Sequence, residues 1–288
     1  MSEPESSAAQ PADDFSRRAC AWPRRPRSAG PVRLVAPEEI PGWIVHEDER
    51  LLVVNKPGDV VCHPSKAGPW SSLVGALREY TGLPTVHLVF RLDRETSGIV
   101  VLAKDARMAS RLQVAMQDRR IGKAYLAILT GTLAAPVTVE QPLGDDVTSP
   151  VFVKSAVVTD GTGQAALTRF TPVASGGGFT LARVATTTGR KHQIRAHAQW
   201  LGHALVGDKI YGPDARLYLD FIDRGWTDDL ATKLLLPRQA LHCAEIDLRP
   251  AGLPLVFAAP LPDDLQSFLA RHGMTTGPAS PNPPRTRD

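Results

Sequence analysis

Short apolar runs rich in β-branched residues recur along the chain, separated by polar and glycine-containing turns. They occupy residues 50–57, 87–90, 98–104, 123–131, 165–173, 179–186, 240–248 and 253–259. Runs of this length and composition predict β-strands. Most of the intervals between them are too short for the crossover that a parallel pair needs, so we expect mainly antiparallel pairing.

Helical spacing of apolar residues is less frequent. Asp105 is a suitable N-cap for a helix over residues 106–120, in which Met108 and Leu112 lie four residues apart on one stripe. A second helix is predicted over residues 190–202, where a terminal glycine is a common stop signal. Shorter helices are expected at 72–80, 214–222 and 263–272.

Together these elements predict an α+β fold with a mixed, mainly antiparallel sheet and flanking helices. One domain over residues 40–272 accounts for them, because we find no internal repeat and no linker in this range. Residues 1–33 and 275–288 are rich in Pro and Ser and lack apolar periodicity, so we expect both tails to be disordered. The glycines of residues 175–179, SGGGF, predict a hairpin turn.

The composition is typical of a globular protein, with 43% hydrophobic and 22% charged residues. No apolar run approaches the ~20 residues of a membrane helix and no secretory signal is present, so we expect a cytoplasmic location without membrane contact. Three scattered cysteines, Cys20, Cys62 and Cys243, predict reduced thiols. The net charge is +3, but residues 34–274 carry 25 basic and 25 acidic side chains, so any nucleic-acid site must rest on a local arrangement.

Residues 87–104, HLVFRLDRETSGIVVLAK, carry the most distinctive charge pattern. Asp93 lies between Arg91 and Arg94, after one apolar run and before the glycine-containing turn into the next. This predicts that Asp93 stands at the end of a strand, where a rigid sheet holds functional side chains. A turn aspartate that hydrogen-bonds to its own backbone is the alternative, and this segment alone does not decide between them.

Basic residues gather where the second long helix is predicted to begin. Arg190, Lys191, His192 and Arg195 would there accompany the free N–H groups and the positive end of the helix dipole, an environment suited to phosphate or carboxylate. A solvated helix face is the alternative. The arginines of the N-terminal tail could likewise contact phosphates or be simply solvated.

Other kinds of site have little support. The pairs Cys62-His63 and His242-Cys243 lack the spacing that completes a tetrahedral zinc site, so we expect no metal. The SGGGF stretch lacks the Lys-Ser/Thr ending of a P-loop, and Ser97 lies outside a G-x-S-x-G motif.

Five blocks in order resemble the RluA-type family of RNA pseudouridine synthases: FRLDRETSG, GKAYLAILTG, TGRKHQIRAHAQWLG, GDKIYG and ALHCAEI. Residues 55–65, NKPGDVVCHPS, are also similar to the family's opening strand. The resemblance extends from about residue 45 to residue 260, and its RLDxxTSG and HQIR blocks are highly specific. It implies an isomerase that detaches uracil from C1′ of its ribose, turns the base and rejoins it through C5, without a cofactor.

The resemblance also implies roles for individual residues. Asp93 matches the catalytic aspartate, which attacks the nucleotide or abstracts a proton, and Arg195 matches the arginine that keeps it ionised. Tyr125 matches the tyrosine that lies against the uracil face, although as a strand residue it could equally belong to the core. Arg91 matches the arginine that fills the stack left by the flipped nucleotide. The phosphate-binding candidates are Arg190, Lys191 and His192.

Two departures from the family pattern bear on the substrate. Members commonly carry His before RLD, but Phe90 stands there, which puts a loop or RNA contact in doubt. The residues before 45 are too few for the S4-type RNA-binding domain that members often have. We therefore expect a monomer whose catalytic domain recognises a small stem-loop of ribosomal or transfer RNA. An RNA-binding relative without catalysis and a nucleoside hydrolase are the alternative functions.

Overall fold

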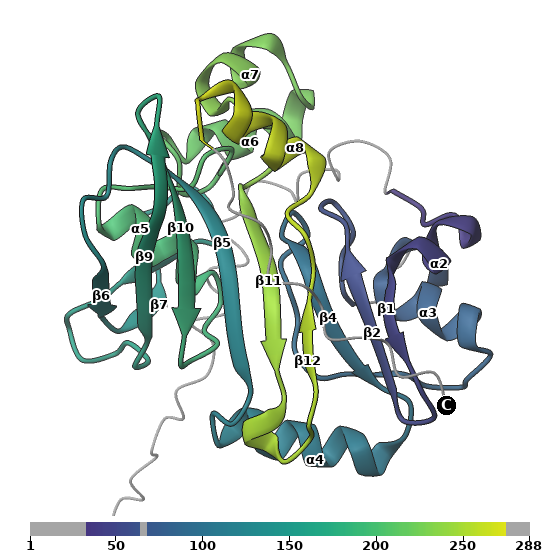
Figure 1. Ribbon diagram of the computed structural model, residues 1–288. Helices are drawn as coiled ribbons and strands as arrows, with labels where there is room; N and C mark the ends of the chain where they lie inside the picture. The colour runs from purple at the N-terminus through teal and green to yellow at the C-terminus, as the bar shows by residue number, and fades with distance from the viewer. Residues whose placement is uncertain (1–32, 64–67, 275–288) are drawn as a thin grey trace, which may run out of the picture.

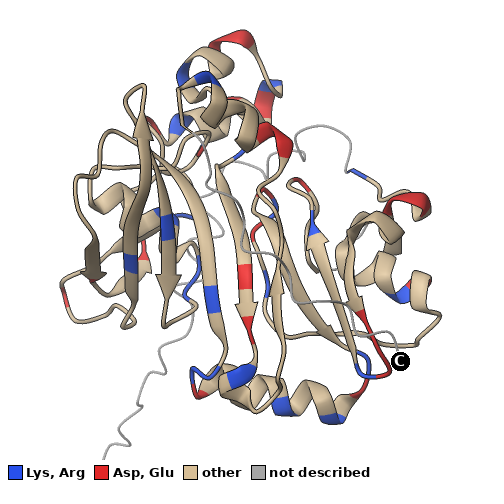
Figure 2. Cartoon of the chain, in the orientation of Figure 1, with Lys and Arg blue, Asp and Glu red and all other residues tan. Residues whose placement is uncertain are grey.

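The computed structural model describes residues 33–63 and 68–274, which fold around one large sheet (Figure 1). The two tails that the sequence predicts to be disordered lie outside these residues, apart from Arg33. Basic and acidic residues are interspersed over the ribbon (Figure 2), in keeping with the balanced charge of residues 34–274. Within the described ranges, no helix combines the length and the apolar character needed to cross a bilayer.

The elements are short and alternate along the chain. The strands are β1 (Ile44–Glu47), β2 (Leu51–Lys56), β3 (His87–Leu88), β4 (Ser97–Ala103), β5 (Gly122–Thr130), β6 (Val137–Glu140), β7 (Leu143–Asp145), β8 (Ser155–Val157), β9 (Leu167–Gly176), β10 (Phe179–Thr186), β11 (Leu241–Asp247) and β12 (Val256–Ala258). The α-helices are α2 (Ile40–Trp43), α3 (Leu73–Thr81), α4 (Ala106–Gln117), α5 (Gln193–Trp200), α6 (Arg216–Arg224), α7 (Asp228–Leu234) and α8 (Asp263–Arg271). Single 3-10 turns are η1 (Pro37–Glu39), η2 (Pro69–Ser71) and η3 (Arg249–Ala251).

The large sheet has ten strands in the order β1-β2-β4-β11-β5-β10-β9-β6, with β3 paired to β4 and β12 paired to β11. Strands β7 and β8 form a separate two-stranded ribbon. In the part of the chain that the structure describes, every strand pairing is antiparallel except that of β4 with β11. This parallel contact pairs Ser97 with His242 and Gly98 with Cys243, and it joins the two halves of the sheet.

Gly98 makes this contact possible. Its φ is +113°, and a Cβ atom there would lie 2.3 Å from the carbonyl oxygen of Cys243. Neither the backbone conformation nor the space admits a side chain, so the glycine of the TSG sequence is required for β4 to reach β11.

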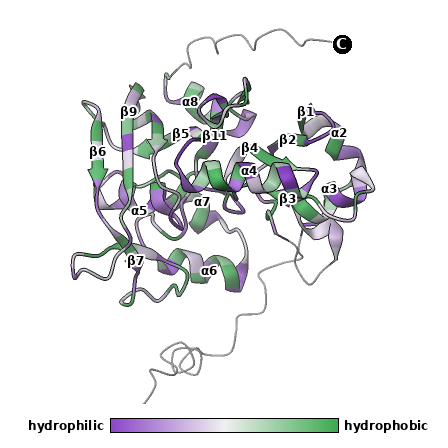
Figure 3. Cartoon of the chain, turned by 90° about the horizontal axis from the view of Figure 1, so that it is seen from below, coloured by the Kyte–Doolittle hydropathy of each residue, from purple (hydrophilic) through white to green (hydrophobic). Residues whose placement is uncertain are grey.

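Apolar side chains from both halves of the sheet form one continuous core. β4 is buried along its whole length, which explains its uninterrupted apolar run, since strands covered on both faces do not alternate. α4 crosses the lower end of the sheet, whereas α6, α7 and α8 gather at the opposite end (Figure 1). Figure 3 shows hydrophobic residues along the strands and a mixture of hydrophobic and hydrophilic residues along α6, which buries Leu217.

The predicted fold class is confirmed, since the sheet is mixed and mainly antiparallel and carries flanking helices. Each predicted strand and helix overlaps an observed one, and the predicted SGGGF turn joins β9 to β10. The prediction missed β1, β6, β7, β8, α2 and α7, because these elements are too short to give a clear periodicity. The helix predicted from residue 190 begins instead at Gln193.

Candidate active site

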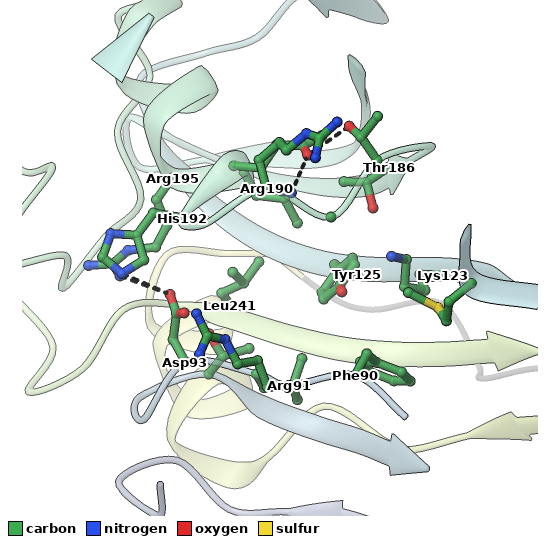
Figure 4. Close-up of a pocket in the computed structure, with 17 residues that line it drawn as sticks. Phe90, Arg91, Asp93, Lys123, Tyr125, Thr186, Arg190, His192, Arg195 and Leu241 are labelled. Carbon is green, nitrogen blue, oxygen red and sulfur yellow. Dashed lines mark hydrogen bonds and ion pairs between the residues drawn. The ribbon is translucent and has the colours of Figure 1, made fainter. Parts of the chain in front are cut away.

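A pocket of about 300 Å³ opens beside the junction of the two sheet halves (Figure 4). Thr96 and Leu241, the neighbours of the paired residues Ser97 and His242, line its floor. The predicted site residues that line the pocket are Asp93, Tyr125, Arg195, Arg91, Arg190 and His192. Lys191 is exposed just outside this lining. The structure therefore brings together residues that lie up to about a hundred positions apart in the sequence.

Asp93 lies in the loop between β3 and β4, and the prediction that it stands at the end of a strand was wrong. The apolar run before it pairs as a strand only over its first two residues, His87–Leu88. Lys56 anchors this loop from the end of β2. Its buried Nζ donates to the carbonyl oxygens of Pro57, Val60 and Arg94 at 2.8, 2.9 and 3.1 Å.

Arg195, in the first turn of α5, holds the carboxylate of Asp93. Its Nη1 donates to Oδ2 of Asp93 at 2.9 Å, while its Nε and Nη2 donate to the two oxygens of Asp208 at 2.7 and 2.8 Å. Asp208 is fully buried and also accepts the backbone N–H groups of Ile210 and Tyr211, each at 3.0 Å. Asp208 thus fixes the guanidinium in a bidentate pair, and Nη1 remains available to donate to Asp93.

The electrostatics of this pair keep Asp93 ionised. Its side chain is 33% exposed, so the carboxylate faces the pocket. Burial acts to raise the pKa of Asp93, but the Arg195 guanidinium and a hydrogen bond from Gln239 hold it below its usual value. The pKa of Asp208 is also lowered, because Arg195 outweighs the effect of burial. An ionised carboxylate in a pocket can act as a nucleophile or as a general base.

Tyr125 of β5 forms the wall next to the acid (Figure 4). Its ring is both part of the core and part of the pocket, so the two alternatives for this residue are compatible. Burial raises its pKa well above 10 and raises that of the neighbouring Cys243 thiol to about 12, so both groups stay protonated. A fixed aromatic ring is suited to stacking on a flat base.

The far end of the pocket carries positive charge. Lys123 lies two residues before Tyr125 on the same face of β5, and burial lowers the pKa of its ammonium. Among the described residues, none forms a hydrogen bond or ion pair with Lys123, nor with the exposed Arg91, which lies nearer to Asp93 (Figure 4). Phe90, which replaces the family's common His, lines this end and packs on the core. This end can therefore receive an anionic group.

Gln193 explains why the helix starts later than predicted. Its Oε1 accepts the hydroxyl of Thr188 at 2.8 Å and the N–H of Arg190 at 3.0 Å, and its Nε2 donates to the carbonyl oxygen of Leu167 at 2.9 Å. These bonds hold residues 188–192 in a turn between β10 and α5, so the basic residues precede the helix rather than forming its first turn.

The two exposed basic residues of this turn already have protein partners. Lys191 pairs with Asp145 at 3.0 Å, and Nε of Arg190 donates to the carbonyl oxygen of Ala165 at 3.1 Å. Both side chains remain at the surface next to the pocket. A phosphate could reach either of them without disturbing the core.

His192 is placed differently from these two neighbours. Its side chain is only 13% exposed, and its Nε2 lies 3.9 Å from Oδ2 of Asp93. Its Nδ1 lies 3.0 Å from the hydroxyl of Tyr211. Burial and the nearby Arg195 lower the pKa of His192 to about 4, so its ring is neutral at physiological pH.

Sequence reasoning missed two residues that hold the acid. Asp208 stands in the GDKIYG block but was given no role, and the available signal was a carboxylate within a segment, residues 205–211, that proves to be buried. No pattern in the sequence marked Gln239 as a site residue. Its Nε2 donates to Oδ2 of Asp93 at 3.3 Å and to the hydroxyl of Thr96 at 2.7 Å.

The cysteines and histidines do not assemble into a metal site in the part of the chain that the structure describes. Cys62 and Cys243 are free, buried thiols. His242 contacts Ser97 and the carbonyl oxygen of Ala259 instead, at 3.0 and 3.3 Å.

Comparison with known proteins adds to this geometry. Residues 50–200 match the protein family described as RNA pseudouridylate synthase. Ribosomal large subunit pseudouridine synthase D of Vibrio vulnificus is 35% identical over 235 residues, which cover 79% of this chain and 70% of that protein. The protein of the same name from Escherichia coli K12 is 33% identical over 240 residues, which cover 81% of this chain and 71% of that protein.

Two solved structures have the same fold. Human RNA pseudouridylate synthase domain containing 4 superposes with a TM-score of 0.67 at 24% identity, covering 82% of this chain and 94% of that one. Human RNA pseudouridylate synthase domain containing 1 superposes with a TM-score of 0.61 at 24% identity, covering 86% of this chain and all of that one.

Proposed function

We proceed from the fact that the chain belongs to the RluA-type family of RNA pseudouridine synthases, isomerases that act on uridines in RNA, and we propose that its substrate is ribosomal RNA. The names of its relatives from Vibrio vulnificus and Escherichia coli support ribosomal over transfer RNA. The target would be a uridine in a small, locally folded stem-loop. The proposed active form is a monomer.

Asp93 is the proposed catalytic carboxylate. It would begin the reaction by attacking the nucleotide or by removing a proton from it, after which the C1′–N1 bond breaks and a C1′–C5 bond forms. The hydrogen on C5 leaves as a proton and N1 gains one, so the reaction is an isomerisation. Arg195 would keep Asp93 ionised through the 2.9 Å contact, which is the observation that carries the proposal.

Binding of the nucleotide involves the rest of the pocket. A uridine within folded RNA must leave its stack, at a cost of a few kcal/mol, before it can reach Asp93. Tyr125 would lie against the extruded uracil, and Arg91 would take the vacated place in the stack. Arg190 and Lys191, exposed beside the pocket, are the proposed phosphate contacts.

The activity is tested with RNA labelled with tritium at C5 of uracil. We expect the wild-type protein to release tritium and Asp93→Asn to release none, with RNA affinity within about tenfold of wild type, or ~1.4 kcal/mol. Asp229→Asn is a matched control, because Asp229 is an exposed acid of α7 that pairs with Lys233. Comparable tritium release by Asp93→Asn would refute the role of this residue. Release of free uracil instead of label exchange would favour a hydrolase.

The substrate is tested separately by mapping pseudouridines in cells with and without this gene. We expect sites to be lost from ribosomal RNA. Loss confined to transfer RNA would overturn the proposed substrate while leaving the activity intact.

A further inference from the structure

His192 adopts a backbone conformation that few residues other than glycine tolerate. Its φ and ψ are +56° and +20°, at the position immediately before α5. Holding a non-glycine residue in this left-handed region costs on the order of 1–2 kcal/mol, and such residues cluster at functional sites. Gln193 and the first turn of α5 impose this conformation, and it turns the imidazole inward, toward Asp93 (Figure 4).

The hydrogen-bonding partners of Tyr211 determine which nitrogen of His192 carries the proton. The Tyr211 oxygen accepts the backbone N–H of Ser155 at 2.8 Å. Because a backbone N–H can only donate, Nδ1 of His192, 3.0 Å away, is the partner to which the phenol can donate its own proton. Nδ1 is then an acceptor, and the ring proton must be on Nε2.

Both hydrogen bonds to the Asp93 carboxylate are made to the same oxygen, which the His192 ring also faces. Oδ2 receives Nη1 of Arg195 at 2.9 Å and Nε2 of Gln239 at 3.3 Å, and Nε2 of His192 lies 3.9 Å from it. No described residue forms a hydrogen bond with Oδ1. The carboxylate is therefore held by one edge, and its other oxygen is free toward the pocket.

We propose that His192 is a positioning residue, held by Tyr211 as the neutral Nε2–H tautomer, that helps to fix Oδ2 of Asp93 and leaves Oδ1 as the oxygen that reacts with the nucleotide. At 3.9 Å the Nε2–H group is too far from Oδ2 for a hydrogen bond, but it directs a dipole at this oxygen without adding a second positive charge. Arg195 therefore remains the only cation in contact with Asp93 among the described residues. The pKa of the imidazole is lowered to about 4, which agrees with this assignment. A buried, neutral ring would contribute little to phosphate binding.

The tautomer is tested directly by nitrogen NMR of histidine side chains in the full-length protein, with His192→Gln used to assign the signal. We expect Nδ1 to be unprotonated and Nε2 protonated from pH 7.5 down to pH 5.5. Tyr211→Phe removes the donor to Nδ1 and should produce a mixture of tautomers. A proton on Nδ1, or an imidazolium at neutral pH, would overturn the proposal.

Kinetics test the effect on Asp93, and this part rests on the proposed function. Asn tolerates the left-handed conformation but is too short to reach Asp93, so His192→Asn should lower kcat about tenfold or more while RNA affinity changes less than about threefold. His192→Gln, whose amide can occupy the place of Nε2, should recover much of the loss. Weaker binding with a smaller salt dependence and an unchanged kcat would instead identify a phosphate contact. If the wild-type protein released no tritium, the proposed function would fail while the NMR assignment stood.

Discussion

At the scale of single residues, one guanidinium serves two carboxylates. Arg195 gives two of its donors to Asp208 and one to Asp93, so its position is set by the buried partner rather than by the one in the pocket. Asp93 is thereby paired with a cation that cannot follow it if it moves toward a substrate. Such a preorganised pair costs little rearrangement during the reaction.

The first residue-scale prediction concerns pH. Arg195→Met should raise the pKa of Asp93, because loss of the nearby positive charge disfavours the carboxylate form. Since the proposed reaction needs ionised Asp93, the acid limb of kcat/KM for tritium release should move to higher pH by about one unit or more. An unmoved limb would contradict the role of Arg195.

Two further variants test whether a displaced acid limb comes from the loss of the Arg195 charge rather than from a general loss of charge or of stability. Arg183→Met removes an exposed arginine that pairs with Glu245, and it should leave the pH profile unchanged. Arg195→Met also strands the buried charge of Asp208, which can cost about 3–5 kcal/mol of stability. The double variant Arg195→Met with Asp208→Asn removes the stranded charge and should show the same displaced acid limb in a better-folded protein.

The sequence allowed Asp93, Arg195 and Tyr125 to be identified through their motif, but not the residues that orient them. Gln239 reaches Asp93 across 146 positions of sequence, and no spacing rule links the two. His192 was predicted as a phosphate ligand because it stands in a basic run, yet the φ of +56° turns its ring inward. That conformation depends on side-chain hydrogen bonds of Gln193, which periodicity does not report.

At the scale of elements, the positions of the strands in the sequence were easier to predict than the partners with which they pair. The apolar runs of β2 and β4 define these strands because both faces are covered. They do not indicate which strand lies beside β4, and its contact with β11 extends over only two residue pairs. The signal for that contact was a single glycine in the TSG sequence.

We therefore predict that Gly98→Ala destabilises the protein by about 3 kcal/mol or more, because it adds both backbone strain and a clash with Cys243. Gly82→Ala is a matched control. Gly82 also has a positive φ, +66°, but no atom lies within 4 Å of an added Cβ, so it should cost only about 1 kcal/mol. Urea unfolding followed by circular dichroism measures both values, and equal losses would argue against a close contact at the junction.

At the scale of the whole molecule, the pocket occupies the place where the two sheet halves diverge. The Asp93 loop comes from one half, Tyr125 from the other, and Arg195 from the helix that follows β10. The fold class could be predicted from strand spacing, whereas this convergence could not, because it depends on one short parallel contact. The arrangement also buries ionisable groups near the junction, and these tie the stability of the fold to pH.

Three histidines with a lowered pKa, His192, His197 and His242, contribute to this dependence in mildly acidic solution. Burial lowers the pKa values of His192 and His242 to about 4, from 6.5 in the unfolded chain. Between these pH values the unfolded state binds more protons than the folded state, so stability rises with pH through this window and is lost as the pH falls from 6.5 toward 4. Each histidine contributes up to about 1.4 kcal/mol per pH unit.

His242→Gln should therefore flatten the dependence of unfolding free energy on pH between 4.5 and 6.5 by up to about 1.4 kcal/mol per pH unit. Ser97→Ala removes the hydroxyl that lies 3.0 Å from Nδ1 of His242 but keeps the buried ring. Because burial is the main cause of the lowered pKa, this control should reduce stability at every pH and preserve the slope. Urea titrations at several pH values measure these slopes. If His242→Gln kept the wild-type slope, His242 would not be held neutral in the folded protein, and the acid sensitivity would have to come from other groups.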